Sequence, residues 1–216
     1  MSIQEKIIQY IRRNRVSTTE VADCLGKTGL LEGAHPVNRG HFRVGPVRWV
    51  YGYDESNWTL HEQVRDVQEG EVVVVETFNC KGRAAFGELV TKFVIFYRGA
   101  AAIASTAPMR DGNDLIKQNH PMWCNGITPI GTFNTKPERP MDPEIIADRE
   151  KKYNGSIAVC DDSGVVIIPP DMVTEAFYDK LVFIERQEDI WFDCIDRLKW
   201  DTFDTVCLKK YLEKDV

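Results

Sequence analysis

Two short segments of the sequence carry groups that could bind a small acidic molecule at one place. The first, Gly87 to Val90, stands where a loop should turn into a helix, so its free backbone N–H groups and the helix dipole could receive a carboxylate. The second is the pair Arg110 and Asp111, which follows a run of small apolar residues ending near Ser105. Because ligands of α/β proteins gather beyond the carboxyl ends of strands, the two segments can face one another across one crevice.

The Arg110–Asp111 pair suits the chemistry of a 2-oxo acid. A guanidinium forks onto a carboxylate, and an aspartate holds a hard divalent cation through oxygen. The cation then polarises the keto oxygen. When a carbon–carbon bond beside that carbonyl breaks, negative charge collects on the oxygen as an enolate, which a cation already in place stabilises.

The same pair also has a purely structural interpretation. Arg110 and Asp111 can form a surface salt bridge, or Asp111 can cap the helix expected at about 113–118. On spacing alone this interpretation is the more economical, because adjacent Arg-Asp pairs are common.

Other reactive side chains form no pattern of comparable strength. No two of the four histidines have zinc-site spacing; His61, beside Glu62 on an amphipathic stretch, is the one worth following as a general base, although a solvated histidine is the simpler reading. Cys124 and Cys160 have no evident histidine partner. The six cysteines lie far apart without a C-x-x-C pair, which indicates reduced thiols, most of them in the core.

The elements that must position these groups follow a β-α-β order. Four consecutive valines, 72–75, predict a central strand covered on both faces, residues 84–97 predict a helix, and residues 100–105 predict a second buried strand. Extended chain is expected at 42–51, broken at Gly45-Pro46, and a strand pair at 156–168 turns through Asp162 to Gly164. Residues 121–143 show little periodicity and no element is expected there.

Helices are expected at both ends of the chain. Ile3 to Ile11 has helical spacing, Ser17 to Glu20 fits a capping box, Asn57 can cap a helix, and a long helix should run from about Met172. These elements predict one compact α/β domain with a central β-sheet and flanking helices. We divide the chain into an N-terminal helix (1–16), the α/β domain (17–190) and a C-terminal helical extension (191–216).

Composition excludes several classes of partner. The 216 residues carry a net charge of −6, and Lys and Arg are scattered, so we expect no nucleic-acid partner. No apolar run approaches the ~20 residues of a membrane helix, and the N-terminus lacks the apolar core of a signal peptide. We therefore expect a cytoplasmic protein without a membrane partner.

Several segments, in order, resemble the RraA-like family. The run GELVTKFVIFYRGAAAIASTAPMRDGNDLI resembles the family's core, with its Gly-Glu-Leu helix start and Arg-Asp pair. Residues 17–26 look like its opening capped helix, 57–75 like its helix and "pGDvlVvd" strand, and 155–169 is similar to its "GDiVvaDddGVvvvP" hallmark. The similarity covers most of residues 17–190.

The resemblance implies a metal-dependent aldolase or decarboxylase of 2-oxo acids, built as a homotrimer that is sometimes doubled to a hexamer, with sites between subunits. Arg110 would bind substrate, Asp111 would bind Mg²⁺ or Mn²⁺, and the segment Gly87, Glu88, Leu89 and Val90 would offer backbone N–H groups to the 2-oxo acid. A glutamate of the neighbouring subunit, Glu185 or Glu188, would complete the water shell of the metal.

This sequence departs from the family at two positions. The family usually has Asp-Gly where Thr106 and Ala107 stand, so the expected pocket loses a carboxylate, although Thr106 can still donate a hydrogen bond to substrate. A non-catalytic RraA-like regulator that binds a partner protein is therefore the alternative. The aromatic tail, with Trp191, Phe192, Trp200, Phe203 and Tyr211, extends beyond the family's usual end and fits either a core or a subunit contact.

Overall fold

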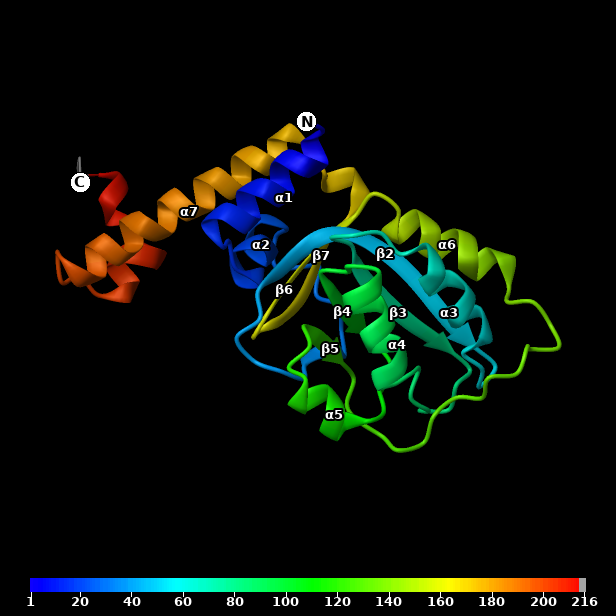
Figure 1. Cartoon of the computed structure of the whole chain (residues 1–216). Coiled ribbons are helices and arrows are strands. Elements are labelled where there is room, and N and C mark those ends of the chain that lie inside the picture. The colour runs from blue at the N-terminus through cyan, green and yellow to red at the C-terminus, as the bar shows by residue number, and fades with distance from the viewer. Residues whose placement is uncertain (214–216) are drawn as a thin grey trace.

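The computed structural model describes residues 1–213, and its centre is one seven-stranded sheet with the order β1-β5-β4-β3-β2-β6-β7 (Figure 1). The strands are β1 (His35–Pro36), β2 (Arg43–Tyr53), β3 (Val72–Phe78), β4 (Ala102–Ser105), β5 (Met122–Cys124), β6 (Ile157–Asp161) and β7 (Gly164–Ile168). The strands β2, β3, β4 and β5 run parallel to one another. β6 pairs antiparallel with β2, β7 pairs antiparallel with β6, and β1 pairs antiparallel with β5. The predicted α/β class with a central sheet is confirmed.

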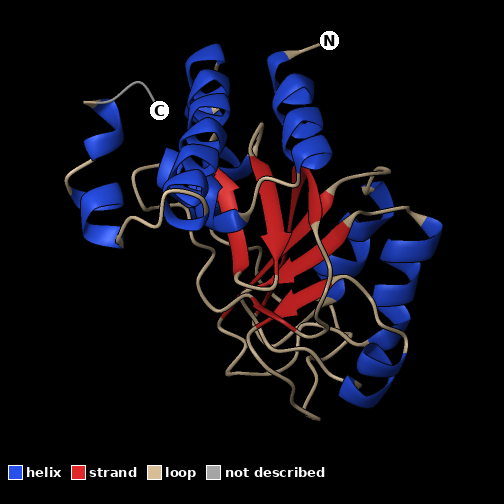
Figure 2. Cartoon of the chain, turned by 90° about the vertical axis from the view of Figure 1, so that its left-hand side faces the viewer, coloured by secondary structure: helices blue, strands red, loops and turns tan. Residues whose placement is uncertain are grey.

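Helices surround this sheet (Figure 2). They are α1 (Ile3–Asn14), α2 (Thr18–Cys24), α3 (Trp58–Gln63), α4 (Glu88–Lys92), α5 (Gly112–Lys117), α6 (Pro143–Tyr153) and α7 (Glu175–Asp196), with short 3₁₀ or π turns η1 (Val64–Asp66), η2 (Phe93–Tyr97), η3 (Pro170–Met172), η4 (Phe203–Cys207) and η5 (Lys210–Leu212). The capping box at the start of α2 is confirmed: Glu20 N–H donates to Ser17 Oγ at 3.2 Å, and Ser17 N–H donates to Glu20 Oε2 at 2.6 Å. The expectation of no element at 121–143 was wrong, since β5 lies there and α6 begins at its end.

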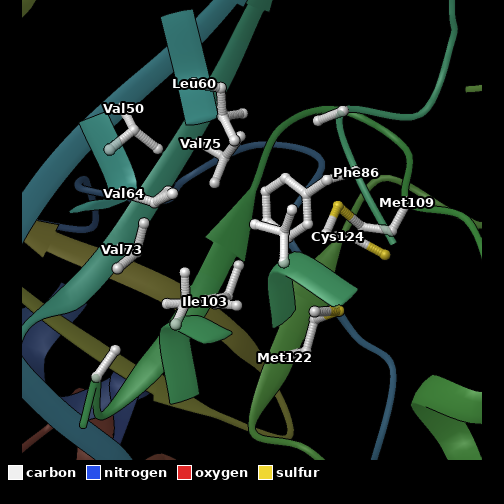
Figure 3. Close-up of a cluster of buried hydrophobic side chains, with 14 of the residues drawn as sticks. Val50, Leu60, Val64, Val73, Val75, Phe86, Ile103, Met109, Met122 and Cys124 are labelled. Carbon is white, nitrogen blue, oxygen red and sulfur yellow. The ribbon is translucent and has the colours of Figure 1, made fainter. Parts of the chain in front are cut away.

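β3 holds the centre of the sheet, as its four valines predict. All four are fully buried, and they alternate between two hydrophobic clusters on the opposite faces of the sheet. Val73 and Val75 belong to the same cluster as Leu60 of α3 and Met109 (Figure 3). The other two valines pack with Trp123 and Tyr153.

β2 is continuous, so the predicted break at Gly45-Pro46 is wrong. The strand instead changes partner there: residues 43–46 pair with β6, and the chain from Val47 onward pairs with β3. A Cβ on Gly45 would lie 2.1 Å from the carbonyl oxygen of Gly70, so this crossing point has room only for glycine. Pro46, which has no N–H to donate, stands at the changeover between the two ladders.

The helix expected at 84–97 starts later, at Glu88. Residues 84–87 are extended because their backbone bonds to neighbouring loops: Ala84 N–H donates to Ile130 O at 2.8 Å, and Ala85 N–H donates to Pro108 O at 2.9 Å. Gly87 is the N-cap of α4, which agrees with the helix start expected at Gly87 to Val90.

α1, α2 and α7 form a helical unit at the β6–β7 end of the sheet (Figure 1). Its core contains Ile7, Ile11, Phe177 and Leu181, each at most 1% exposed. Beyond this unit the aromatic tail is mixed, with Tyr211 buried and other rings such as Phe192 exposed; residues 214–216 of the expected extension lie outside the described residues. Over residues 1–213 the structure has no helix whose length and apolar character would allow it to cross a membrane.

Candidate functional site

The structure brings the two candidate segments together at the carboxyl ends of β3 and β4. The backbone N–H of Arg110 donates to Phe86 O at 3.0 Å, so the loop after β4 lies along the loop before α4. The backbone N–H of Glu88 donates to Asp111 Oδ2 at 3.0 Å. Residues some twenty positions apart in sequence are thus hydrogen-bonded to one another, at the edge of the sheet where α/β proteins bind ligands. We call this site, formed by residues 86–90 and 106–111, the corner.

Asp111 occupies the N-cap position of α5 but does not cap it. Its backbone is left-handed, with φ 60° and ψ 36°, and its side chain makes no hydrogen bond to the first turn of α5. The carboxylate turns instead to α4 and accepts from its first N–H. The helix-cap interpretation of Asp111 is therefore wrong for the following helix, and the left-handed backbone, which costs conformational energy in any residue but glycine, aims the side chain elsewhere.

Gly87 makes this arrangement possible. A Cβ at Gly87 would lie 2.0 Å from Asp111 Oδ2 and 2.7 Å from Arg110 Cγ, distances that no real side chain tolerates. The glycine therefore lets both side chains of the pair approach the backbone of the α4 start.

The salt bridge that the structural interpretation proposes is present but loose. Arg110 Nε lies 3.6 Å from Asp111 Oδ2, and the two side chains are 51% and 39% exposed. At this distance and exposure such a pair adds less than about 1 kcal/mol to stability. The Arg110 guanidinium therefore remains available to a ligand.

The first turn of α4 presents donors next to Asp111. The Glu88 N–H is used by Asp111, and the first bond of the helix runs from Thr91 N–H to Gly87 O at 3.1 Å. Helix geometry gives the N–H groups of Leu89 and Val90 no partner inside the helix. The Glu88 carboxylate points to α5, where Gln118 Nε2 donates to its Oε1 at 2.5 Å.

Thr106 stands at the end of β4, at the same edge of the sheet. Its backbone N–H donates to Val75 O at 3.0 Å, and its hydroxyl is 3.4 Å from the same oxygen. Ala107 beside it is buried, at 3% exposed. At the two positions that depart from the family pattern, Thr106 thus has a hydroxyl in place of the carboxylate and Ala107 has a methyl group in place of the glycine hydrogen.

The donor set at this corner fits a hard cation held by few protein ligands. Over residues 1–213 no group of three or more His, Cys, Asp or Glu side chains forms a closed metal site. Asp111 uses Oδ2 toward Glu88, while no hydrogen bond within the described chain engages its Oδ1. Mg²⁺ commonly keeps several waters and takes one or two carboxylates together with substrate oxygens, a pattern that one aspartate can serve.

Glu185 and Glu188 are not part of this corner in a single chain. Both lie on α7, which Figure 1 shows at the upper left, away from α5 at the bottom of the view. Glu185 accepts hydrogen bonds from Tyr10 OH and, at 3.3 Å, from Asn14 Nδ2. Burial raises the pKa of Glu188, and the nearby carboxylates, Glu20 first among them, raise it further.

The other candidate side chains have structural surroundings. His61 lies on the surface of α3 and lines, with Leu89 and Val90, a cavity of about 520 Å³ beside α4. Cys124 and Cys160 are buried, and burial raises the pKa of both thiols, so neither is an activated nucleophile. Five of the six cysteines are buried and all six are free, as predicted.

One part of the corner was missed from sequence. Residues 126–133, here named the strap, cross the site: Met109 N–H donates to Gly126 O, and Thr132 N–H to Ala84 O. A Cβ at Gly131 would lie 3.0 Å from Arg110 Nη1. Glycines and a proline in an aperiodic stretch were the only signal, and they indicate a loop without saying what it covers.

Known proteins share both the sequence pattern and the fold. A protein of Halalkalibacterium halodurans named "Putative 4-hydroxy-4-methyl-2-oxoglutarate aldolase" is 26% identical over 164 residues, which are 75% of this chain and 77% of that protein. An uncharacterized protein from Pseudomonas syringae pv. tomato has a similar structure, with a TM-score of 0.71 and 20% identity, covering 95% of this chain and 94% of that one. The likeness of fold therefore reaches into the helical ends.

A second structure carries the family's name. RraAS2 of Streptomyces coelicolor, described as an unusual member of the RNase ES inhibitor RraA protein family, has a TM-score of 0.65 and 21% identity and covers 86% of this chain and 96% of that one. The model of the RraA-like family, described as Aldolase/RraA, matches residues 18–167, which is more than half of the sequence. This chain belongs to the RraA-like family.

Proposed function

We propose that this protein is a divalent-metal-dependent lyase, an aldolase or decarboxylase that cleaves or forms a carbon–carbon bond next to a 2-oxo carboxylate. Pyruvate or a close relative would be released or consumed. The observation that carries the proposal is the Asp111 carboxylate, held by a left-handed backbone between the first N–H of α4 and the Arg110 side chain. We assign the reaction to residues 17–190, with 1–16 and 191–216 as helical extensions.

Arg110 would bind the carboxylate of the 2-oxo acid. Its guanidinium is half exposed and only loosely paired with Asp111, so a bidentate grip on a carboxylate is open to it. The N–H groups of Leu89 and Val90 would orient the same substrate, because donors at a helix start favour an anion. Thr106 would offer a hydroxyl at the floor of this pocket.

Asp111 would hold the cation, Mg²⁺ or Mn²⁺, through Oδ1. When bound, the cation supplies a positive charge that stabilises the negative charge developing on the keto oxygen. The Glu88 N–H keeps Asp111 Oδ2 occupied and so fixes the direction in which Oδ1 points.

A simple assay tests this proposal. Oxaloacetate decarboxylation is the least demanding reaction for such a site, so purified protein with Mg²⁺ should release pyruvate and CO₂ from oxaloacetate and lose the activity with a chelator. No turnover over a panel of 2-oxo acids, with either metal, would contradict the proposal.

We further propose a homotrimer or hexamer in which Glu185 or Glu188 reaches the site of a neighbouring subunit. Two observations support it: α7, which carries these glutamates, lies away from α5 in its own chain (Figure 1), and α4 with η2 exposes Leu89, Phe96 and Tyr97. Light scattering should give a trimer or hexamer at micromolar concentration. A stable monomer would rule out the shared site.

Subunit mixing tests the shared site itself. If it exists, inactive Asp111→Asn protein and inactive Glu185→Gln/Glu188→Gln protein should regain activity when denatured and refolded together, because roughly a quarter of mixed sites then carry both native side chains. Absence of regained activity, with mixed oligomers demonstrated, would remove the two glutamates from the site.

A non-catalytic regulator that binds a partner protein is the second candidate. Thr106 and Ala107 favour it, because the corner has one carboxylate fewer than the family pattern. The Streptomyces coelicolor structure is also described within a family of RNase ES inhibitors. Restoring the carboxylate by Thr106→Asp separates the candidates: a gain of turnover from an inactive native protein would identify a chain that has lost catalysis.

A further inference from the structure

The strap places a second guanidinium beside the one that the proposed function uses. Gly131 lies between them: a Cβ on this residue would stand 3.0 Å from Arg110 Nη1, and its carbonyl oxygen accepts from Arg83 Nη1 at 3.1 Å. Arg83 belongs to the loop after β3, and Arg110 to the loop after β4, so both come from the carboxyl edge of the sheet. Two cationic forks therefore flank a single glycine.

Arg83 is held rigidly, yet not all of its donors are used. Its Nε donates to Glu55 Oε2 at 2.7 Å, its guanidinium lies 4.7 Å from the centre of the Phe133 ring, and its side chain is 26% exposed. Within residues 1–213 both N–H groups of Nη2 lack a hydrogen-bond acceptor. A guanidinium fixed on three sides with free donors is prepared for an anion, because little conformational freedom remains to be lost on binding.

The ion pairs around Glu55 leave one positive charge without a counter-charge. Glu55 also accepts from Lys81 Nζ at 2.5 Å, so one carboxylate is shared between two cations and the group as a whole keeps one positive charge. On the other side of Gly131, Arg110 and Asp111 balance each other. An anionic group of a ligand is therefore attracted to the Arg83 side of the strap.

The loops that carry this group are strained. Glu55 has φ 57° and Lys81 has φ 50°, left-handed values that are uncommon for residues other than Gly, Asn and Asp. Such backbone persists where the surrounding structure holds it, and it concentrates at ligand sites. Here it brings the Glu55 carboxylate between Lys81 and Arg83.

We propose that Arg83 is a specificity-determining residue of the site, which binds the second acidic group of a dicarboxylic 2-oxo acid while Arg110 binds the carboxylate beside the oxo group. This rests on the proposed binding of a 2-oxo acid at Arg110. The competing explanation gives Arg83 only the task of fixing the strap to the turn after β2.

A matched pair of ligands separates the two explanations. 2-Oxoglutarate and 2-oxopentanoate have the same five-carbon chain and differ only in a terminal carboxylate against a methyl group. We expect the native protein with Mg²⁺ to bind 2-oxoglutarate at least about tenfold more tightly in calorimetry, since a hydrogen-bonded charge is worth a factor of this order.

Arg83→Gln should remove this preference by weakening 2-oxoglutarate about tenfold while 2-oxopentanoate changes less than about twofold. Lys81→Gln is the matched control: it removes the other cation that pairs with Glu55, but its side chain is 68% exposed and the donors of Arg83 remain, so it should weaken 2-oxoglutarate by no more than about threefold. Arg83→Lys, which keeps the charge, should retain part of the preference. Thermal unfolding of each variant shows whether it is folded.

Four results would overturn the inference. Equal weakening of both ligands by Arg83→Gln would assign Arg83 to fixing the strap, and an unchanged preference would leave the second acidic group to another residue. A native protein that binds both ligands equally would contradict the inference while the proposed function stands. A native protein that binds neither ligand would also overturn the inference, and turnover over the panel of 2-oxo acids then decides separately whether the proposed function stands.

Discussion

The corner at Asp111 and the helical unit at Glu188 surround a carboxylate in opposite ways; the first carboxylate is exposed and the second is half-buried. Asp111 has an N–H donor at 3.0 Å and a guanidinium at 3.6 Å. Glu188 lines a cavity of about 410 Å³ together with Glu20, Glu185 and Asp189. Burial is the main cause that raises the pKa of Glu188, and the negative charges of these neighbours raise it further. Asp111 has its compensating groups within reach, whereas Glu188 forms no ion pair within residues 1–213, although Arg186 also lines its cavity.

The difference indicates which half of the proposed site a single chain completes. The Asp111 corner is assembled by backbone contacts within one chain, so its part of the proposed site does not depend on a neighbouring subunit. The acidic cavity keeps repulsive energy that a proton, a cation or a neighbouring subunit would relieve. Substitutions that alter one of the two carboxylates or its surroundings, with little change in side-chain shape, test this comparison.

Asp111→Asn should have the largest effect. The substitution keeps the shape and an acceptor for the Glu88 N–H but removes the anionic oxygen, so metal binding and nearly all metal-dependent turnover should be lost, by about a thousandfold or more. Calorimetric titration with Mn²⁺ and steady-state kinetics measure the two losses. Retained metal-dependent activity would return Asp111 to the role of a structural cap for α4.

Gly87→Ala should come next. Its methyl group would meet Asp111 Oδ2 at 2.0 Å, so the carboxylate must move. A displacement of this size costs about a hundredfold in turnover, with a loss of stability of about 1–3 kcal/mol from overpacking. Leu89→Ala, which changes a side chain that is 78% exposed on the same turn, is the control and should alter stability little. An unchanged kcat in Gly87→Ala would show that the position of Asp111 does not matter.

Arg110→Lys should have a smaller and more selective effect. Lysine keeps the charge but loses the planar fork, so a two-point grip becomes one movable contact. Turnover should fall by about tenfold to a hundredfold, while the metal affinity stays within a few-fold of the native value, because no ligand of the metal has changed. Loss of the metal in this variant would mean that the roles of Arg110 and Asp111 are wrongly divided.

Glu188→Gln should have the smallest effect, and one with a pH dependence. Because the pKa of Glu188 is raised in the folded state, the folded chain holds this proton more tightly than the unfolded chain, so stability falls as pH rises through the folded pKa. A neutral glutamine avoids this loss, and at pH about 7 to 8 its melting temperature should exceed the native one by a few degrees, roughly the effect of 1 kcal/mol in a chain of this size.

The advantage of Glu188→Gln should shrink as pH falls below the raised pKa, where the native glutamate is itself protonated. Glu138→Gln, on an exposed loop, is the control and should show no such trend. A native protein more stable than Glu188→Gln at neutral pH would indicate that this carboxylate is compensated after all.

Elements with strong local signals were predictable from sequence, and those set by pairing partners were not. The buried valines of β3 and the capping box at Ser17 carry their own evidence and were confirmed. β1 and β5 have two and three residues, too few to show an alternation of apolar and polar residues. They form because β5 pairs with β4 and β1 pairs with β5. α6 did have a readable start, since Asp142 N-caps it and Pro143 takes its first position.

The candidate corner divides in the same way. Arg110, Asp111 and Gly87 could be named from motif spacing, and the structure brings them together. The left-handed backbone of Asp111 and the approach of Gly131 to Arg110 depend on long-range contacts that spacing does not contain. For that reason the helix-cap interpretation of Asp111 was wrong in its partner, and the strap was overlooked.

The change of partner within β2 has a consequence for how the chain folds. Residues 43–46 of β2 pair with β6, which lies in the last third of the sequence, whereas residues 47–53 pair with β3, which follows closely. Contacts between distant segments form slowly, because a long loop must close first. During synthesis, β2, β3 and β4 can therefore assemble while residues 43–46 still present an open strand edge. We expect folding to end with the docking of the β6–β7 hairpin on that edge, and a chaperone or a second nascent chain to compete for it until then.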